Sequence, residues 1–386
     1  MHIARRTRNF TESVIRGMTR LAREHDAINL AQGFPNFPTP DVLKDAAAAA
    51  VARDINQYAI TWGSKRLRDA LTARYAEWYQ MEIDPEREIT VTCGATEAMA
   101  ATLMAIVDPG DEVIVPEPFY ENYGPDAVLC DARPVYVPLR PGEPLDLDRV
   151  ARAITPKTRA IIVNTPNNPT GRVLTAHELN GIAELCLRHD IYAVTDEIYE
   201  HIRYDGPHIP IGTLPGMRDR TITISGASKT FSVTGWRVGW IIAPPATTDA
   251  IRKVHDFLTV GAPAPLQDAV AVALEVCDAG FYKLLSTEYR ARRDLLCGAL
   301  ASAGFRITPP EGAYYVLADF SSLSDLSDVE FSYWMTKEIG VSPVPGSSFY
   351  SEKEMGKKFV RFAFCKTEEM LKEAGERLKR VGKGGR

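Results

Sequence analysis

The sequence predicts an α/β protein, with a mostly parallel sheet of seven strands followed by a smaller α+β unit. Two patterns lead to this prediction. Seven short runs that are apolar on both faces alternate with helical patterns between residues 88 and 243, which is typical of a parallel sheet covered by helices on both sides. From about residue 280 the pattern changes to one long charged helix, followed by strands mixed with helices.

The elements follow in order along the chain. A helix opened by Thr39-Pro40-Asp41 is expected to include the alanine-rich stretch 45–52. Strands are then expected at 88–92, 111–116, 133–139, 159–165, 191–197, 220–225 and 237–243, with helices at 94–107 and 177–189. After a helix over 281–304, strands are expected in FRITP, AYYVLADF and FVRFAFC. The predicted division is an N-terminal segment (1–41) packing with the small domain, a large domain (42–280) and a small α+β domain (281–386).

Composition narrows the class of protein. Among the 386 residues, 45 Lys and Arg stand against 50 Asp and Glu, which gives a net charge of −5 and no support for nucleic-acid binding. No apolar run reaches the ~18 residues of a membrane span, so no membrane association is expected. The N-terminus does not resemble a secretory signal. Six scattered cysteines without a CxxC pair favour a reducing cytoplasm.

Polar residues cluster where the predicted strands end, and ligands bind beyond the carboxyl ends of strands in open α/β sheets. Gly94, Ala95 and Thr96 open a helix after the first strand, and a helix N-terminus of small residues can hold a phosphate. The alternative is an ordinary strand-to-helix turn. The stretch NTPNNPTG, which holds Asn164 and Asn168, offers more amides than a turn requires, although an Asn/Pro turn is the alternative.

Two further strand ends carry charges. Asp196 ends one strand, with Tyr199 three residues later; it is either a helix cap or a carboxylate facing a protonated ring nitrogen. Lys229 follows the next strand among small residues, with Arg237 eight positions on. Either both residues are solvated surface cations, or Lys229 is a nucleophilic amine and the guanidinium of Arg237 binds a phosphate. Together the strand ends offer what pyridoxal 5′-phosphate (PLP) requires: a lysine, an anion site and an acid.

The stretch GASKTFSVTGWRVG (226–239) resembles the lysine-attachment signature of class I/II PLP-dependent aminotransferases of fold type I. The resemblance continues through NLAQGFPNFPTPD, NQYAITWG, GATEA, VPEPFYENYGP, NTPNNPTG, TDEIYEHI and VRFAFCKTEE, and covers about residues 10 to 382. The motifs QGFP, NQY with WG, and EPFY are most similar to the kynurenine, glutamine and methionine aminotransferase group.

The resemblance implies a role for each matching residue. Lys229 is the Schiff-base lysine and proton carrier, Asp196 pairs with the pyridine nitrogen, and Tyr199 and Asn168 bond the phenolic oxygen. Tyr120 stacks on the ring, and the phosphate is bound by Gly94, Ala95, Thr96, Arg237 and a serine. In a homodimer, Tyr58 reaches the phosphate from the other subunit. The substrate carboxylate is bound by Arg361, with help from Asn168 and Gly33. Many relatives carry serine where this chain has Gly226, so Ser225 and Ser228 are both candidates for the phosphate contact.

The implied function is transfer of an amino group from an L-amino acid to a 2-oxo acid by a ping-pong mechanism. Aromatic residues near Tyr58, Trp62 and Tyr120, with Ile15, suggest a largely apolar pocket for neutral, aromatic or sulfur-containing donors, kynurenine and glutamine included. No second arginine is assigned, so an aspartate-type enzyme is a less favoured alternative. A PLP-dependent cysteine-conjugate β-lyase is another, and a regulator that keeps the fold for binding is a third. No metal is expected.

Overall fold

The computed structural model describes residues 4–8, 12–139 and 142–381. Its main feature is a seven-stranded sheet of order β2-β8-β7-β6-β5-β3-β4, in which β8 is antiparallel to both of its neighbours and the other pairs are parallel. The strands are β2 (Ile89–Thr92), β3 (Glu112–Glu117), β4 (Arg133–Pro138), β5 (Thr158–Asn164), β6 (Tyr192–Asp196), β7 (Thr221–Gly226) and β8 (Gly239–Ile242). The predicted mostly parallel α/β sheet is confirmed.

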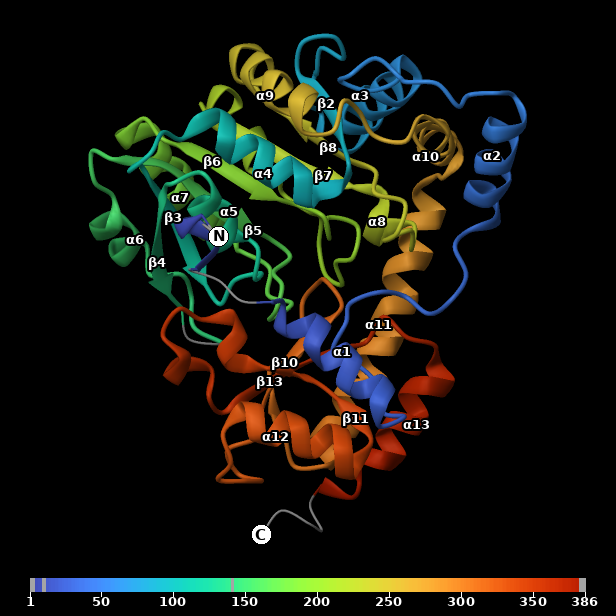
Figure 1. The fold of residues 1–386 in the computed structure, drawn as a ribbon, viewed down its shortest axis with the longest axis vertical. Helices are drawn as coiled ribbons and strands as arrows, with labels where there is room; N and C mark the ends of the chain where they lie inside the picture. The colour runs from blue at the N-terminus through green and yellow to red at the C-terminus, as the bar shows by residue number, and fades with distance from the viewer. Residues whose placement is uncertain (1–3, 9–11, 140–141, 382–386) are drawn as a thin grey trace.

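Successive residues of the central strands are buried on opposite faces of this sheet, because side chains alternate along a strand. Ile162 packs with the cluster beneath α4 (Gly94–Ile106), whereas its neighbours Ile161 and Val163 pack beneath α7 (Ala176–His189). Helices therefore cover both faces, as Figure 1 shows. The other helices of this part are α2 (Asp41–Ala52), α3 (Lys65–Tyr79), α5 (Tyr123–Leu129), α6 (Leu147–Ala153), α8 (Ala227–Thr230), α9 (Pro245–Leu258) and α10 (Ala264–Val276).

A second, smaller part of the molecule, here called the second body, is built on a four-stranded sheet of order β12-β13-β10-β9. It follows the long helix α11 (Ala279–Ser302), which in Figure 1 runs from the upper body to the lower one. Its elements are β9 (Arg306–Ile307), β10 (Tyr315–Asp319), α12 (Asp328–Trp334), β12 (Val344–Pro345), β13 (Phe359–Ala363) and α13 (Glu368–Leu378). The expected strands in all three C-terminal stretches are present.

The N-terminal segment lies against this second body. Helix α1 (Val14–Glu24) contacts β12 and β11 (Val341–Ser342), and β1 (Ile28–Asn29) pairs with β11 in parallel. Short 3₁₀ turns lie at Arg5–Arg8, Ile211–Thr213, Arg218–Arg220, Gly346–Phe349 and Lys353–Gly356, and a π turn at Met335–Ile339. The exact domain boundaries stay predictions.

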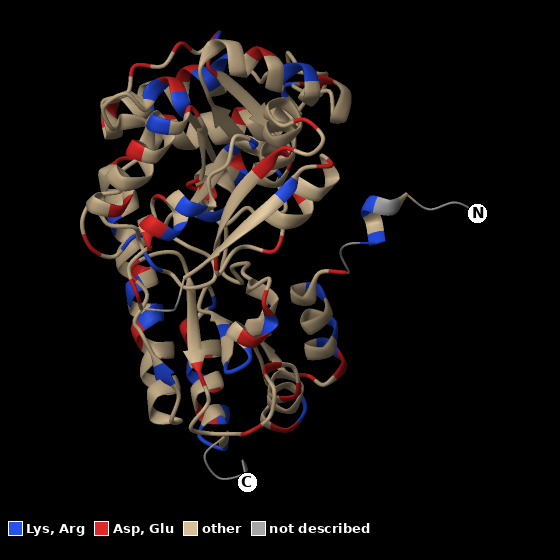
Figure 2. Cartoon of the chain, turned by 90° about the vertical axis from the view of Figure 1, so that its left-hand side faces the viewer, with Lys and Arg blue, Asp and Glu red and all other residues tan. Residues whose placement is uncertain are grey.

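Acidic and basic residues are interspersed over the molecule in Figure 2. Within the described ranges, no helix combines the length and apolarity that crossing a membrane requires.

Candidate active site

A cavity of about 590 Å³ opens between the large sheet and the second body. It gathers most of the residues that the sequence singled out: Gly33, Ala95, Thr96, Tyr120, Asn168, Asp196, Tyr199, Ser228, Lys229, Arg237 and Arg361. They come from both ends of the sequence, because the carboxyl ends of the parallel strands meet at one edge of the sheet and β13 faces that edge.

Lys229 lies in the short helix α8 directly after β7. Its Nζ contacts the carbonyl oxygen of Gly33 at 3.5 Å and lies 5.9 Å and 5.8 Å from the ring centres of Tyr199 and Tyr314. Burial lowers the pKa of Lys229 to about 8, and the nearby Arg237 adds to this effect. About a tenth of the amine is therefore neutral and nucleophilic at pH ~7, far more than for an ordinary lysine.

Asp196 is the last residue of β6, and its carboxylate lines the same cavity. The phenol of Tyr123 donates a hydrogen bond to Asp196 Oδ2 at 2.7 Å, and the backbone N–H of Ile198 donates to Oδ1 at 3.3 Å. Burial raises the pKa of Asp196, while these hydrogen bonds oppose the rise. No cation of the described chain forms an ion pair with Asp196, so the site suits a ligand that brings a positive charge.

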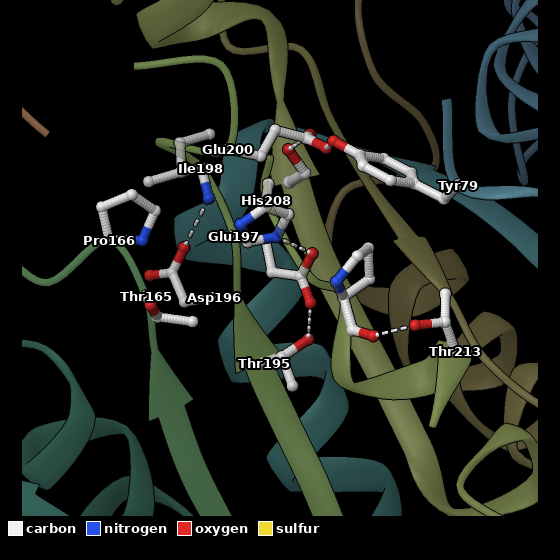
Figure 3. Close-up of polar contacts among 12 residues, drawn as sticks. Tyr79, Thr165, Pro166, Thr195, Asp196, Glu197, Ile198, Glu200, His208 and Thr213 are labelled. Carbon is white, nitrogen blue, oxygen red and sulfur yellow. Dashed lines mark hydrogen bonds and ion pairs between the residues drawn. The ribbon is translucent and has the colours of Figure 1, made fainter. Parts of the chain in front are cut away.

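The next acid, Glu197, is engaged elsewhere. Its carboxylate accepts a hydrogen bond from Thr195 at 2.9 Å and lies 2.7 Å from Nε2 of His208, as Figure 3 shows. Glu200 accepts from Tyr79 at 2.5 Å in the same view. Asp196 therefore remains the carboxylate of this strand end that faces the cavity.

Arg237 and the start of α4 form a cradle for an anion. Arg237 Nη1 donates to the carbonyl of Thr234 at 3.1 Å, and Nη2 approaches Thr96 Oγ1 at 3.5 Å. A Cβ at Gly94 would collide with this guanidinium, so only glycine permits the close approach. No carboxylate in the described part of the chain pairs with Arg237, which leaves the cation and the helix N–H groups for a phosphate.

Arg361 on β13 is fully buried without a counter-charge among the described residues. Its Nη1 donates to Asn168 Oδ1 at 2.8 Å and its Nη2 to the carbonyl of Ala31 at 2.5 Å, while its Nε has no partner. The guanidinium lies 4.3 Å from the ring centre of Tyr315. A buried cation without an anion is costly, so Arg361 is built for a carboxylate that a ligand supplies.

Three predicted residues lie outside the cavity lining. Gly94 stands behind Arg237, as described above. Ser225 is buried and donates to Glu200 at 2.6 Å, which turns its hydroxyl away from the anion cradle, whereas Ser228 lines the cavity. Tyr58 is 88% exposed, so in one chain alone it contributes nothing to this site.

The expected apolar wall is only partly present. Ile15 and Tyr120 line the cavity, whereas Trp62 lies outside it with the guanidinium of Arg252 4.8 Å from its ring centre. An arginine that the sequence analysis left unassigned, Arg16, also lines the cavity.

Sequence reasoning also missed Tyr123, Asp126, Tyr315 and Phe34, which line the cavity. Tyr123 carried a usable signal, because it lies in the motif VPEPFYENYGP only three residues after Tyr120. Tyr315 carried none, because only the pairing of β10 with β13 places it beside Arg361.

The donor set fits PLP, whose requirements are a reactive amine, an acid for the ring nitrogen and an anion site. Lys229, Asp196 and the cradle at Arg237 supply them within one cavity. Among the described residues, no cluster of His, Cys, Asp and Glu is arranged to hold a metal ion. The fold and the site together define a PLP-dependent transferase.

Comparison with known proteins supports this class. The family model "Aminotransferase class I and II" matches residues 25–378. The probable N-succinyldiaminopimelate aminotransferase DapC of Mycobacterium tuberculosis is 40% identical over 97% of both chains. Its solved structure has a TM-score of 0.95 and covers 98% of this chain and 100% of its own. The methionine aminotransferase of Escherichia coli is 38% identical, and human kynurenine–oxoglutarate transaminase 1 is 37% identical, each over 94% of both chains.

The chain therefore belongs to the class I and II aminotransferases. It is a PLP-dependent enzyme of fold type I, and its substrates are amino acids and 2-oxo acids. The predicted similarity to the kynurenine and methionine aminotransferases is confirmed.

Proposed function

We propose that this aminotransferase moves the amino group of a neutral, aromatic or sulfur-containing L-amino acid to a 2-oxo acid at the cavity around Lys229. The observation that carries the proposal is a pair of cationic groups in one cavity, the half-buried Lys229 and the fully buried Arg361. Lys229 has a pKa lowered to about 8, and Arg361 is fully buried with an unpartnered Nε. Lys229 can act as a nucleophilic amine, and Arg361 can bind the α-carboxylate that every amino acid carries.

PLP, when bound, supplies an electron sink that makes the Cα–H bond of the amino acid acidic. Arg237, Ser228 and the first N–H groups of α4 would hold its phosphate, and Asp196 would hold its ring nitrogen. Tyr123 keeps the Asp196 carboxylate in place through its 2.7 Å hydrogen bond. Tyr199 and Asn168 are assigned to the phenolic oxygen, and Tyr120 to the ring face.

Lys229 Nζ would take the proton from the substrate Cα as a general base and then, as a general acid, donate it to the cofactor carbon instead of Cα. Its lowered pKa supports both steps, because an amine that titrates near the working pH exchanges a proton readily in either direction. Arg361, fixed by Asn168 and Ala31, orients the substrate so that Cα faces this amine. Gly33 leaves room there, since a Cβ at this position would collide with Tyr315.

A homodimer with shared sites is part of the proposal. Tyr58 and Phe257 are 88% and 92% exposed, and Ile60, Leu258 and Val260 beside them are also exposed. The two segments are joined by the contact of Thr61 Oγ1 with Asp256 at 3.2 Å. An exposed apolar patch of this kind indicates an interface, and it would bring Tyr58 to the phosphate of the partner subunit.

A cytoplasmic location is also proposed. All six cysteines are free thiols, which suits a reducing compartment.

The test screens amino donors against 2-oxo acids and reads both products. We expect methionine, glutamine, phenylalanine or kynurenine to be better donors than aspartate. Borohydride reduction of the holoenzyme should attach the cofactor to the peptide that contains Lys229; attachment to Lys366, which is buried, would reject the assigned site. Pyruvate and ammonia formed from a cysteine conjugate without an acceptor would instead identify the β-lyase alternative.

A further inference from the structure

Arg16 stands at the rim of the substrate cavity on the first turn of α1. The backbone of this turn is held in place on both sides of the cavity rim, by Ser13 at the helix N-cap and by the buried Ile15. Ser13 caps the helix by accepting a hydrogen bond from the backbone N–H of Arg16 at 3.3 Å, and its hydroxyl bonds the carboxylate of Glu121. The backbone that carries Arg16 is therefore tied to the residue that follows Tyr120 in the cavity wall.

Ile15 connects this turn to the carboxylate-binding end of the cavity. It is buried in a cluster that includes Ala31 and Phe349. Ala31 accepts the hydrogen bond of Arg361 Nη2, and the ring centre of Phe349 lies 4.9 Å from the same guanidinium. Successive helix residues point about 100° apart, so Ile15 faces inward while Arg16 faces the rim of the same cavity.

The guanidinium of Arg16 makes no hydrogen bond or ion pair with any other residue that the structure describes. The acids around it have other contacts: Glu121 accepts from Ser13, and Glu12, which is within electrostatic reach of Arg16, is held by both Nη atoms of Arg20 at 2.5 and 2.8 Å. Arg20 sits one turn further along α1 and does not line the cavity. Arg16 is thus a cation at the rim of the cavity, whereas Arg20, on the same helix, is paired with Glu12 outside the cavity and provides a control.

We infer that Arg16 binds the side-chain carboxylate of a dicarboxylic substrate while Arg361 binds its α-carboxylate. The inference rests on the proposed function, because it takes the orientation of the substrate from Arg361. Arg16 would thus be a second carboxylate-binding group, beside the apolar walls of the cavity, for one of the two substrates of the ping-pong cycle. Neutral donors would use Ile15 and Tyr120, and a dicarboxylic 2-oxo acid or amino acid would reach past them to Arg16.

The experiment measures the binding of unreactive acids of equal length to the holoenzyme. Glutarate is compared with pentanoate, and adipate with hexanoate, through the change in cofactor absorption and the shift in Tm. We expect the diacids to bind the native enzyme more tightly than the monoacids. Arg16→Gln should weaken only the diacids, by about three- to tenfold because the guanidinium is partly solvated. Arg16→Lys should keep part of the preference.

Arg20→Gln is the matched control and should leave both classes of acid unchanged. An unchanged diacid preference in Arg16→Gln would overturn the inference, as would an equal loss in Arg20→Gln. Arg361→Lys separates this result from a failure of the proposed function. If Arg361→Lys weakens monoacids and diacids alike while Arg16→Gln does nothing, only the role of Arg16 is rejected. If Arg361→Lys has no effect, the proposed substrate site itself is wrong.

Discussion

The phenol of Tyr123 donates a 2.7 Å hydrogen bond to the carboxylate of Asp196, and both groups are buried. The bond joins the first residue of α5 to the last residue of β6. It favours the ionised carboxylate, which burial alone would disfavour. The acid that would pair with the ring nitrogen of PLP is therefore oriented by Tyr123, which also opposes the rise in its pKa; Tyr123 lies in the motif VPEPFYENYGP, but the resemblance assigned it no role.

Replacing Tyr123 with Phe removes this bond while keeping the ring. We expect the affinity of the apoprotein for PLP to fall about tenfold, because a hydrogen bond to a charged group contributes about 1.5 kcal/mol or more. Titration of the apoprotein with PLP measures the change. Tyr192→Phe is the control, since its hydroxyl contacts Thr247 at the other end of β6. Equal losses in both variants would contradict a specific role for Tyr123.

The capture of PLP by the apoprotein should depend on pH through Lys229. Only the neutral amine reacts, so the rate of covalent capture should rise with pH, reach half its maximum near pH 8 and level off above it. An ordinary exposed lysine would give a midpoint near pH ~10.4. Stopped-flow absorbance measures the rate, with Lys229→Ala as the blank. A midpoint near pH ~10 would show that the amine is not desolvated as described.

Arg361→Lys keeps the charge but loses the planar fork. We expect kcat/KM to fall by about 10- to 100-fold for every amino acid tested, because the bidentate contact fixes both the position and the plane of the carboxylate. The ratio between donors should stay nearly constant. Steady-state kinetics with one neutral, one aromatic and one acidic donor tests this. A loss confined to one donor would mean that Arg361 recognises a side chain instead.

Tyr58 should act across a subunit interface. A Lys229→Ala subunit and a Tyr58→Phe subunit are each expected to be impaired, but a hybrid dimer carries one site with both native residues. Mixing the two variants under conditions of subunit exchange should restore activity. If analytical ultracentrifugation finds a monomer under assay conditions in which the enzyme is fully active, the shared site is contradicted. A mixture that is no more active than its components would also contradict it.

Asp126 lies one turn beyond Tyr123 and lines the cavity with a buried Oδ2 that has no described partner. Burial raises its pKa to about 7. The folded state then binds the proton more tightly than the unfolded state, so stability is present at low pH and is lost as the pH rises to about 7. Asp126→Asn should therefore unfold at a higher denaturant concentration than the native protein at pH 8.

The gain should be small near pH 4 and should approach about 4 kcal/mol above pH 7, taking about 1.36 kcal/mol for each unit between the folded and unfolded pKa. Urea unfolding across this pH range measures it. The exposed Asp45, replaced by Asn, serves as the control and should show no such trend. A difference between native protein and Asp126→Asn that does not change with pH would contradict the raised pKa.

The sequence by itself determined the layered α/β fold, since apolar strand runs separated by amphipathic helices have few other ways to bury both faces of a sheet. It also determined the residues at the strand ends, such as Lys229 and Asp196, because local motifs place a side chain relative to its own strand. The tertiary structure decided what required distant segments to meet. Ser225 turns to Glu200 and leaves Ser228 at the cavity, and Tyr123 reaches Asp196. The packing of α1 brings Arg16 to the substrate entrance. Side-chain direction and charge pairing across elements depend on packing, which no single stretch of sequence encodes.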